Sequence, residues 1–217
     1  MKDYIFNKLN KKKLLELLRN NTNAESGGYK IYDGVGSHSL QIPEELVWLI
    51  NELKKLEKDN FKFEKLLEFG FASGFTNTIL NKFFKFKEIV SVDIMDSAGG
   101  SKSSFFANLR FKNIILIAGD SRSSFVKNQI FINSKYDLIF IDGGHEYDVV
   151  HNDFQIAMKN KKKRSVIIFH DIECDQFKGP GKLWKKIIKN KKITCKIKKF
   201  ACKNYLSRFG IGMLIFK

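Results

Sequence analysis

Short apolar runs alternate with segments of helical periodicity from Lys65 onward. Strands are predicted at 65–69, 88–92, 113–117, 136–141 and 165–169. Helices are predicted near 74–84, 101–109, 121–128, 146–159 and 180–190. Alternation at this spacing is typical of right-handed βαβ units. We therefore expect an α/β fold with a Rossmann-like, doubly wound, mostly parallel sheet.

The C-terminal part of the chain has a different pattern. Two strand-like runs, 193–200 and 209–216, are separated only by a short turn-rich segment. A connection this short joins antiparallel strands, whereas parallel strands need a long crossover. We therefore predict an antiparallel hairpin at the sheet edge, which completes a seven-stranded sheet.

The chain before the sheet follows a helical pattern. Apolar positions at helical spacing predict an amphipathic helix at 2–19. Pro43, followed by two glutamates, is typical of a helix start and predicts a second helix that ends near Lys58. These features divide the chain into an N-terminal helical extension or lid, residues 1–60, and a main domain, residues 61–217.

Composition and charge narrow the class of protein. With 217 residues, 43% of them hydrophobic, the chain can bury an ordinary core, which excludes disordered and fibrous classes. The net charge is +16, and residues 159–217 hold most of it, with 18 basic and 3 acidic side chains. Most of the cations are lysines, which favours a solvated face, and an anionic partner is the alternative.

No apolar run approaches the ~20 residues that a membrane helix needs, so no membrane span is expected. The first residues lack the apolar core of a signal peptide, which predicts a cytoplasmic protein. Three cysteines without a Cys-x-x-Cys pair indicate neither a disulfide framework nor a structural zinc site.

Ligands of open α/β sheets bind at the carboxyl ends of the strands. After the first predicted strand, Glu68 precedes a turn that runs from Gly70 to Gly74 and allows a ligand to approach the backbone. Ala72 holds the middle place of this turn, so the dinucleotide fingerprint Gly-x-Gly-x-x-Gly is absent and NAD binding is disfavoured.

The later strands also end in polar residues. Asp93 is placed to accept hydrogen bonds from ribose hydroxyls. Asp120 could accept from an adenine amino group, or it could cap a helix that begins at Ser121. The last two parallel strands end in the sequences Asp142-Gly143-Gly144-His145 and His170-Asp171. The first of these could be a plain tight turn with a solvated histidine, but acids and histidines from neighbouring strands favour a functional site.

The order of these motifs resembles the class I S-adenosylmethionine (SAM)-dependent methyltransferases. The likeness is greatest to the macrocin-type sugar O-methyltransferases and the cephalosporin hydroxylase-like proteins. It covers roughly residues 40–217. It rests on Gln41-Ile42-Pro43-Glu44-Glu45, Glu68-Phe69-Gly70-x-x-x-Gly74, Asp93, Gly119-Asp120-Ser121, Ile141-Asp142-Gly143-Gly144-His145-x-Tyr147, Phe169-His170-Asp171-Ile172 and Gly210-Ile211-Gly212-Met213-Leu214.

The resemblance implies a set of cofactor contacts. The methionine and ribose part of SAM would be lined by Glu68, Gly70, Ala72 and Gly74, with Asp93 on the ribose hydroxyls and Asp120 and Ser121 at the adenine edge. Residues 61–217 would then form the SAM-binding methyltransferase domain.

The resemblance also implies a metal site. In metal-dependent members, an acid after the fourth strand and an adjacent pair after the fifth hold magnesium, and the matching residues are Asp142, His170 and Asp171. His170 departs from the acid-acid or acid-amide pair, and an imidazole nitrogen suits magnesium poorly. Mg, another divalent cation and no metal all stay open at this point.

The function implied is methyl transfer to a hydroxyl group of a small molecule, such as a sugar or a polysaccharide precursor. We interpret His145 as the general base, and Asp142 as a second catalytic residue that with Asp171 would hold a cation against the same oxygen.

Two alternatives remain. A nucleic-acid methyltransferase or RNA-binding protein would explain the basic C-terminal segment. The Asn/Asp-Pro-Pro-aromatic element of base-amine methyltransferases is absent, however, which disfavours a nucleic-acid partner. A catalytically inactive or hydroxylase-like member of the same fold is the other alternative. Whether the acceptor is anionic and whether the chain forms a homo-oligomer are open.

Overall fold

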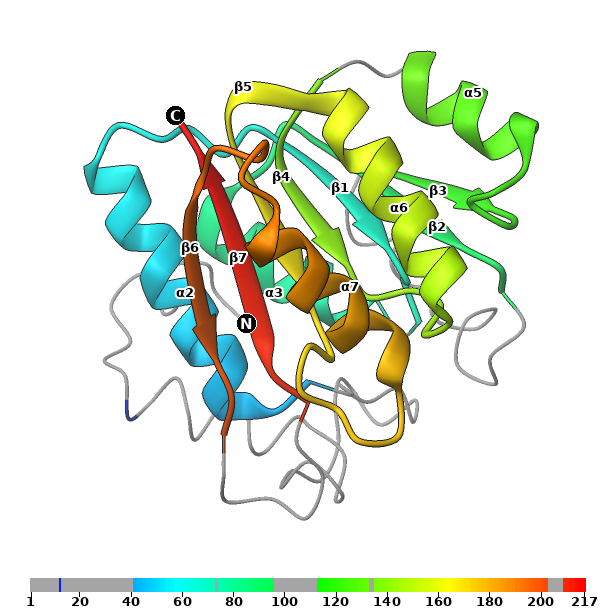
Figure 1. Ribbon diagram of the computed structural model, residues 1–217. Coiled ribbons are helices and arrows are strands. Elements are labelled where there is room, and N and C mark those ends of the chain that lie inside the picture. The colour runs from blue at the N-terminus through cyan, green and yellow to red at the C-terminus, as the bar shows by residue number, and fades with distance from the viewer. Residues whose placement is uncertain (1–11, 13–40, 73, 96–112, 133–134, 203–208) are drawn as a thin grey trace.

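A computed structural model describes residues 12, 41–72, 74–95, 113–132, 135–202 and 209–217, and the account below concerns these residues (Figure 1). The helix predicted at 101–109 lies outside them. So does the helix predicted at 2–19, apart from Lys12. In the described part of the chain, no helix is both long and apolar enough to cross a membrane.

A single seven-stranded sheet forms the centre of the molecule, with strand order β3-β2-β1-β4-β5-β7-β6. Its strands are β1 (Lys65–Phe69), β2 (Glu88–Asp93), β3 (Ile114–Ala118), β4 (Tyr136–Ile141), β5 (Lys161–Phe169), β6 (Lys196–Phe200) and β7 (Ile211–Phe216). Strands β1 to β5 are parallel, and β7 runs antiparallel between β5 and β6. The predicted Rossmann-like sheet and C-terminal hairpin are thus confirmed.

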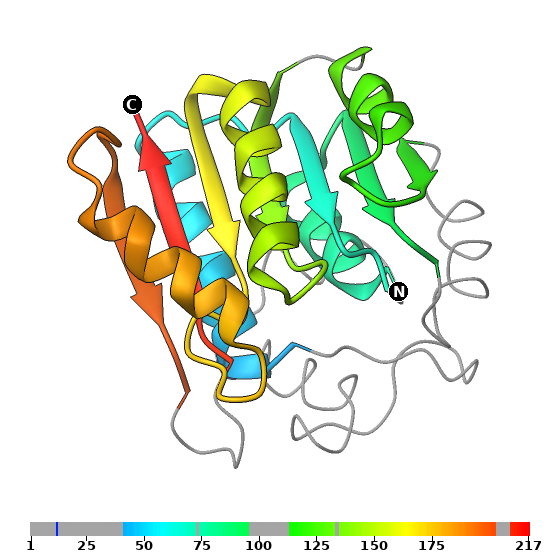
Figure 2. The same ribbon diagram turned by 45° about the vertical axis from the view of Figure 1, so that its right-hand side comes forward.

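Helices cover both faces of this sheet, as Figures 1 and 2 show. One face carries α2 (Pro43–Lys58) and α3 (Phe75–Phe84), and the other carries α5 (Ser124–Ile132), α6 (Tyr147–Asn160) and α7 (Lys178–Lys189). This arrangement is the doubly wound architecture expected from the alternation of strands and helices.

Several element boundaries differ from the predicted ones, and two of these differences have a clear physical reason. Strand β5 begins at Lys161 rather than at 165, because its first four residues are polar and partly or fully exposed and therefore lack an apolar signal. Helix α5 begins at Ser124 rather than at 121, because a turn closed by the Ser123 amide on the Asp120 carbonyl, at 3.0 Å, precedes it.

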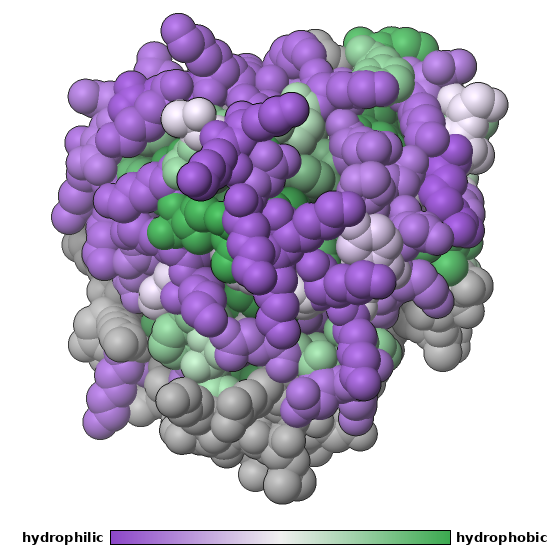
Figure 3. Space-filling view, viewed as in Figure 1, coloured by the Kyte–Doolittle hydropathy of each residue, from purple (hydrophilic) through white to green (hydrophobic). Residues whose placement is uncertain are grey.

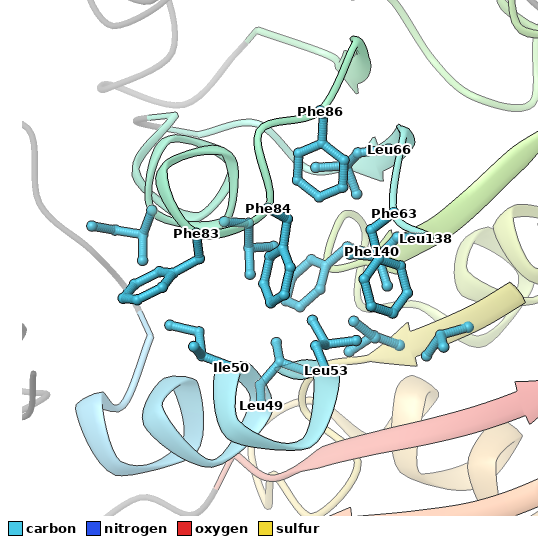
Figure 4. Close-up of a cluster of buried hydrophobic side chains, with 14 of the residues drawn as sticks. Leu49, Ile50, Leu53, Phe63, Leu66, Phe83, Phe84, Phe86, Leu138 and Phe140 are labelled. Atoms are coloured by element: carbon cyan, nitrogen blue, oxygen red, sulfur yellow. The ribbon is translucent and has the colours of Figure 1, made fainter. Parts of the chain in front are cut away.

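Helix α2 packs into the main hydrophobic core. Pro43 begins it with a preset φ, and two glutamates in the first turn suit the positive end of the helix dipole. Its apolar side chains point toward a group of phenylalanines between the helix and the sheet (Figure 4). The labelled members from α2 are Leu49, Ile50 and Leu53. The helix therefore shares one core with the sheet, although the sequence placed it in the extension.

The opposite face has its own core, formed by α6 and α7 against β5 and β7. Trp184 of α7 lies directly over β7, where a Cβ added to Gly212 would come within 2.6–2.8 Å of the indole ring. Glycine at this position therefore lets α7 approach the sheet closely.

Hydrophilic residues dominate the face seen in Figure 3. The exposed side of α7 contributes four lysines to the charge-rich part of the chain: Lys182, Lys185, Lys186 and Lys189. Its other side buries Leu183, Trp184 and Ile187. Helix α7, which lies in the basic C-terminal segment, is therefore amphipathic.

We predict that Leu53→Ala lowers the free energy of unfolding by about 2–5 kcal/mol, because it leaves a cavity at a fully buried core position. Urea unfolding followed by circular dichroism measures the change. The control, Lys58→Ala, removes an exposed side chain from the same helix and should change stability by less than about 0.5 kcal/mol. Equal effects of the two substitutions would show that α2 does not belong to the cooperative core.

Candidate active site

The turn after β1 lies against the end of β4. Gly70 has a φ of +89°, and a Cβ at this residue would overlap the carbonyl oxygen of Asp142. The Gly70 amide donates to the Val92 carbonyl at 2.8 Å, and the Asp142 amide donates to the Phe69 carbonyl at 2.9 Å. The predicted cofactor turn and the predicted catalytic turn are therefore in direct backbone contact.

Asp93, at the end of β2, holds the glycine turn in place. Its Oδ2 accepts hydrogen bonds from the amides of Phe71 at 2.8 Å and Ala72 at 2.9 Å, and its Oδ1 accepts one from Met95 at 2.7 Å. The carboxylate thus lies beside the turn, as a ribose contact requires. Its backbone partners show a second role, because they fix the path of the turn.

Glu68 lies beneath the turn and is fully buried. It accepts hydrogen bonds from Asn77 Nδ2 at 2.8 Å and Ser91 Oγ at 2.7 Å. Burial raises the pKa of Glu68 to about 8, although these two hydrogen bonds oppose the shift. Burial therefore favours the neutral form of Glu68, and its hydrogen bonds join β1 to β2 and α3, while the sequence placed it in the cofactor lining.

Asp120 and Ser121, predicted at the adenine edge, point to different partners. Asp120 forms a two-pronged ion pair with Arg122, with nitrogen–oxygen distances of 2.6–3.0 Å, and this pair lowers the pKa of the carboxyl group. Ser121 is buried, and its hydroxyl donates to Asp153 Oδ1 on α6.

Asp153 was not predicted as a site residue. It is 1% exposed, and Asn152 also donates to its Oδ1 at 3.3 Å. Burial raises the pKa of Asp153 to about 6. The sequence shows Asp153 as a polar residue that interrupts the apolar face of an amphipathic helix, and this signal could have marked it. The sequence gives no sign that its partner is Ser121, 32 residues away.

The ends of β4 and β5 bring together four residues that the sequence singled out. The two strands pair in parallel up to Ile141 and Phe169, so the residues that follow both strands emerge side by side. Asp142 and His145 follow β4, and His170 and Asp171 follow β5. The His170 amide donates to the Ile141 carbonyl at 3.1 Å, which extends the pairing into the site.

Short contacts join these four side chains. His145 Nε2 lies 2.8 Å from Asp171 Oδ2. His170 Nδ1 lies 3.1 Å from Asp142 Oδ1 and 3.2 Å from Asp171 Oδ1. Asp171 adopts a φ of +59°, an uncommon value for a residue other than glycine, which turns its carboxylate toward both histidines.

The electrostatics of the cluster follow from its burial and its opposite charges. Burial alone lowers the pKa of His145, but the carboxylates of Asp171 and Asp142 outweigh it and raise that pKa above its usual value. The same two carboxylates raise the pKa of the buried His170 well above its usual value. Burial alone raises the pKa of Asp171, but both histidines reverse this effect and lower it.

Four further residues surround the cluster, and no role was predicted for any of them. Gln41 Nε2 donates to Asp142 Oδ2 at 2.6 Å. Phe177 stacks on His145 at a centroid distance of 4.0 Å, and Phe209 stacks on His170 at 5.9 Å. Glu45 Oε2 lies 3.7 Å from His170 Nε2. Gln41 and Glu45 belong to the motif Gln41-Ile42-Pro43-Glu44-Glu45, one of those on which the resemblance rests. The sequence around the two phenylalanines gave no sign that they would lie at the site.

The donor set fits a divalent cation. One atom each from Asp142, His170 and Asp171 lies within 4.8 Å of the other two. Asp171 Oδ1 is buried and accepts no well-formed hydrogen bond from any residue that the structure describes, so this oxygen is available to a cation. Two oxygens and one imidazole nitrogen suit Mn²⁺, Fe²⁺ or Zn²⁺ better than Mg²⁺, which prefers oxygen ligands.

The strand order, the glycine turn and the acids at the strand ends together define a class I SAM-dependent methyltransferase domain. Residues 67–172 match a protein family described as a methyltransferase domain. No curated protein matches the sequence.

Solved structures share the fold at low sequence identity. The O-methyltransferase TomG from Streptomyces achromogenes, solved with SAM, aligns with a TM-score of 0.62 and 13% identity over 99% of this chain and 94% of that one. An rRNA methylase from Streptococcus thermophilus aligns with a TM-score of 0.59 and 11% identity over 79% of this chain and 96% of that one. MycE of the mycinamycin pathway was solved with Mg and S-adenosylhomocysteine (SAH). It aligns with a TM-score of 0.55 and 16% identity over 78% of this chain but only 49% of its own length.

We predict that Asp153→Asn removes a pH dependence of stability. The folded pKa of about 6 exceeds the usual 3.8. Ionisation of Asp153 therefore removes roughly 3 kcal/mol from the stability of the wild type as pH rises from about 4 to 6. The neutral variant should become more stable relative to wild type over this interval, and urea unfolding at pH 4–8 measures the difference. Asp148→Asn, an exposed change in the same helix, is the control. Parallel stability curves for Asp153→Asn and wild type would contradict the prediction.

Proposed function

We propose that this protein transfers a methyl group from SAM to a hydroxyl group of a small molecule, with His145 as the general base. The observation that carries the proposal is the 2.8 Å contact between His145 and Asp171 at the carboxyl end of the sheet, next to the glycine turn. TomG and MycE, which have the same fold, support a small-molecule O-methyltransferase by analogy.

His145 has the geometry of a base that is held in place. Its Nε2 faces Asp171, which favours the tautomer with the proton on Nε2 and leaves Nδ1 able to accept another. Its side chain is 36% exposed, so an acceptor can reach it, and Phe177 fixes the plane of the ring. The nearly buried Asp171 stabilises the imidazolium that forms when His145 takes the proton.

The proposed reaction uses these groups as follows. When bound, SAM supplies a methyl group on a positively charged sulfur, and it leaves as SAH after transfer. The acceptor hydroxyl gives its proton to His145 Nδ1, and its oxygen forms the new bond to the methyl carbon as the carbon–sulfur bond breaks. Asp142, His170 and Asp171 would hold a divalent cation, which would supply positive charge that favours the deprotonated hydroxyl.

We predict that His145→Ala lowers methyl transfer by about 10²–10⁴-fold, because the acceptor loses its base. The assay follows tritium from labelled SAM onto a panel of sugars and other hydroxylated small molecules. The control is His151→Ala, since His151 stacks on Tyr147 of α6 at a centroid distance of 5.7 Å and is not one of the four clustered residues. Titration with SAH checks that both variants bind the cofactor product as wild type does. Full activity in His145→Ala would remove His145 from this role.

A further inference from the structure

Glu45 is a buried carboxylate without a part in the reaction described above. It belongs to the first turn of α2 and is 0% exposed. Its Oε1 accepts hydrogen bonds from the amides of Cys202 at 3.1 Å and Gly210 at 3.0 Å, and the Gly210 amide also donates to Oε2 at 3.1 Å. Burying a carboxylate is costly unless partners compensate for the lost water, so the other groups that face Glu45 indicate what its burial serves.

The second oxygen of Glu45 faces His170. Glu45 Oε2 lies 3.7 Å from His170 Nε2, which is buried and has no hydrogen-bond partner among the described residues. The ring plane of His170 is set by Phe140 at 6.5 Å and Phe209 at 5.9 Å between centroids. The Nε2 edge is therefore held toward Glu45, while Nδ1 faces Asp142 and Asp171.

Glu45 also holds the cluster through the backbone. The Gly210 carbonyl accepts from the Ile172 amide at 3.3 Å, and the Phe209 carbonyl accepts from the Glu173 amide at 2.8 Å. Because Glu45 binds the Gly210 amide, it fixes the segment that lies against both Ile172 and the ring of His170. The Glu45 carboxylate thus restrains the His170–Asp171 pair in two ways: it faces the His170 ring directly, and it holds the backbone segment that binds Ile172.

We propose that Glu45 is a positioning residue of the cation site, which sets His170 with Nδ1 toward the metal and the Nε2 proton toward the Glu45 carboxylate. The proposal rests on the metal site included in the proposed function. Histidines that bind metals through one nitrogen usually donate from the other to a carboxylate or carbonyl. Loss of such a partner typically weakens metal binding by about 10- to 100-fold.

The test compares two glutamates of one helix. Glu45→Gln keeps an oxygen for the backbone amides but can place an NH₂ group against the Nε2 proton of His170. Glu52→Gln is the control, because Glu52 is also buried on α2 and pairs with Lys55 and with Lys198 of β6. Mn²⁺ binding to the full chain is measured by calorimetry, and electron spin-echo spectroscopy detects a nitrogen ligand on bound Mn²⁺.

We expect Glu45→Gln to bind Mn²⁺ about 10- to 100-fold more weakly with an altered nitrogen signal, and Glu52→Gln to bind it as wild type does. Wild-type affinity in a folded Glu45→Gln would overturn the proposal, and so would a wild type that binds no Mn²⁺. If Glu45→Gln does not fold, Glu45→Asp, which withdraws the carboxylate from His170, serves instead, and unchanged affinity would again refute the role. SAH binding, measured on every variant, shows separately whether the methyltransferase proposal fails.

Discussion

The close approach of Gly70 to the carbonyl oxygen of Asp142 is the constraint on which the site depends. A side chain at Gly70 would push the end of β1 away from β4, and its φ of +89° is one that other residues rarely adopt. Because the two turns meet there, the predicted cofactor turn and the four-residue cluster share one edge of the sheet. Proximity of this kind between donor and acceptor is the main requirement for an in-line methyl transfer.

Charge balance at this edge is the second requirement. Asp142 and Asp171 are negative groups in a largely buried environment, and the two histidines supply the opposing charge. The same attraction that stabilises the cluster raises the pKa of His145, which otherwise would be lowered by burial. A cation between Asp142 and Asp171 would reduce this attraction and lower the pKa of His145, so that more of the imidazole would be neutral and able to accept a proton. The proposed metal site and the proposed base would thus be electrostatically coupled.

The sequence predicted the parts of the site that belong to strand ends, because a parallel sheet brings such residues to one edge whatever their distance along the chain. This rule predicted that four residues meet at one edge: Asp142, His145, His170 and Asp171. The strands themselves were predicted from their apolar runs. Contacts that depend on side-chain direction could not be predicted. Glu68 faces inward to Asn77 and Ser91, and Asp153 reaches Ser121 from a helix, because burial and tertiary packing decide these pairs.

Part of the basic C-terminal segment has a structural role. Lys198 and Lys199 of β6 pair with Glu52 of α2 and Glu173 of the loop after β5, and Lys162 pairs with the nearly buried Asp137. These ion pairs attach the antiparallel hairpin and the start of β5 to the rest of the fold. The buried carboxylates Glu52 and Asp137 would be costly to bury without a cation nearby. The net charge of +16 already counts these acidic partners, and the surplus positive charge includes the exposed lysines on the outer side of α7.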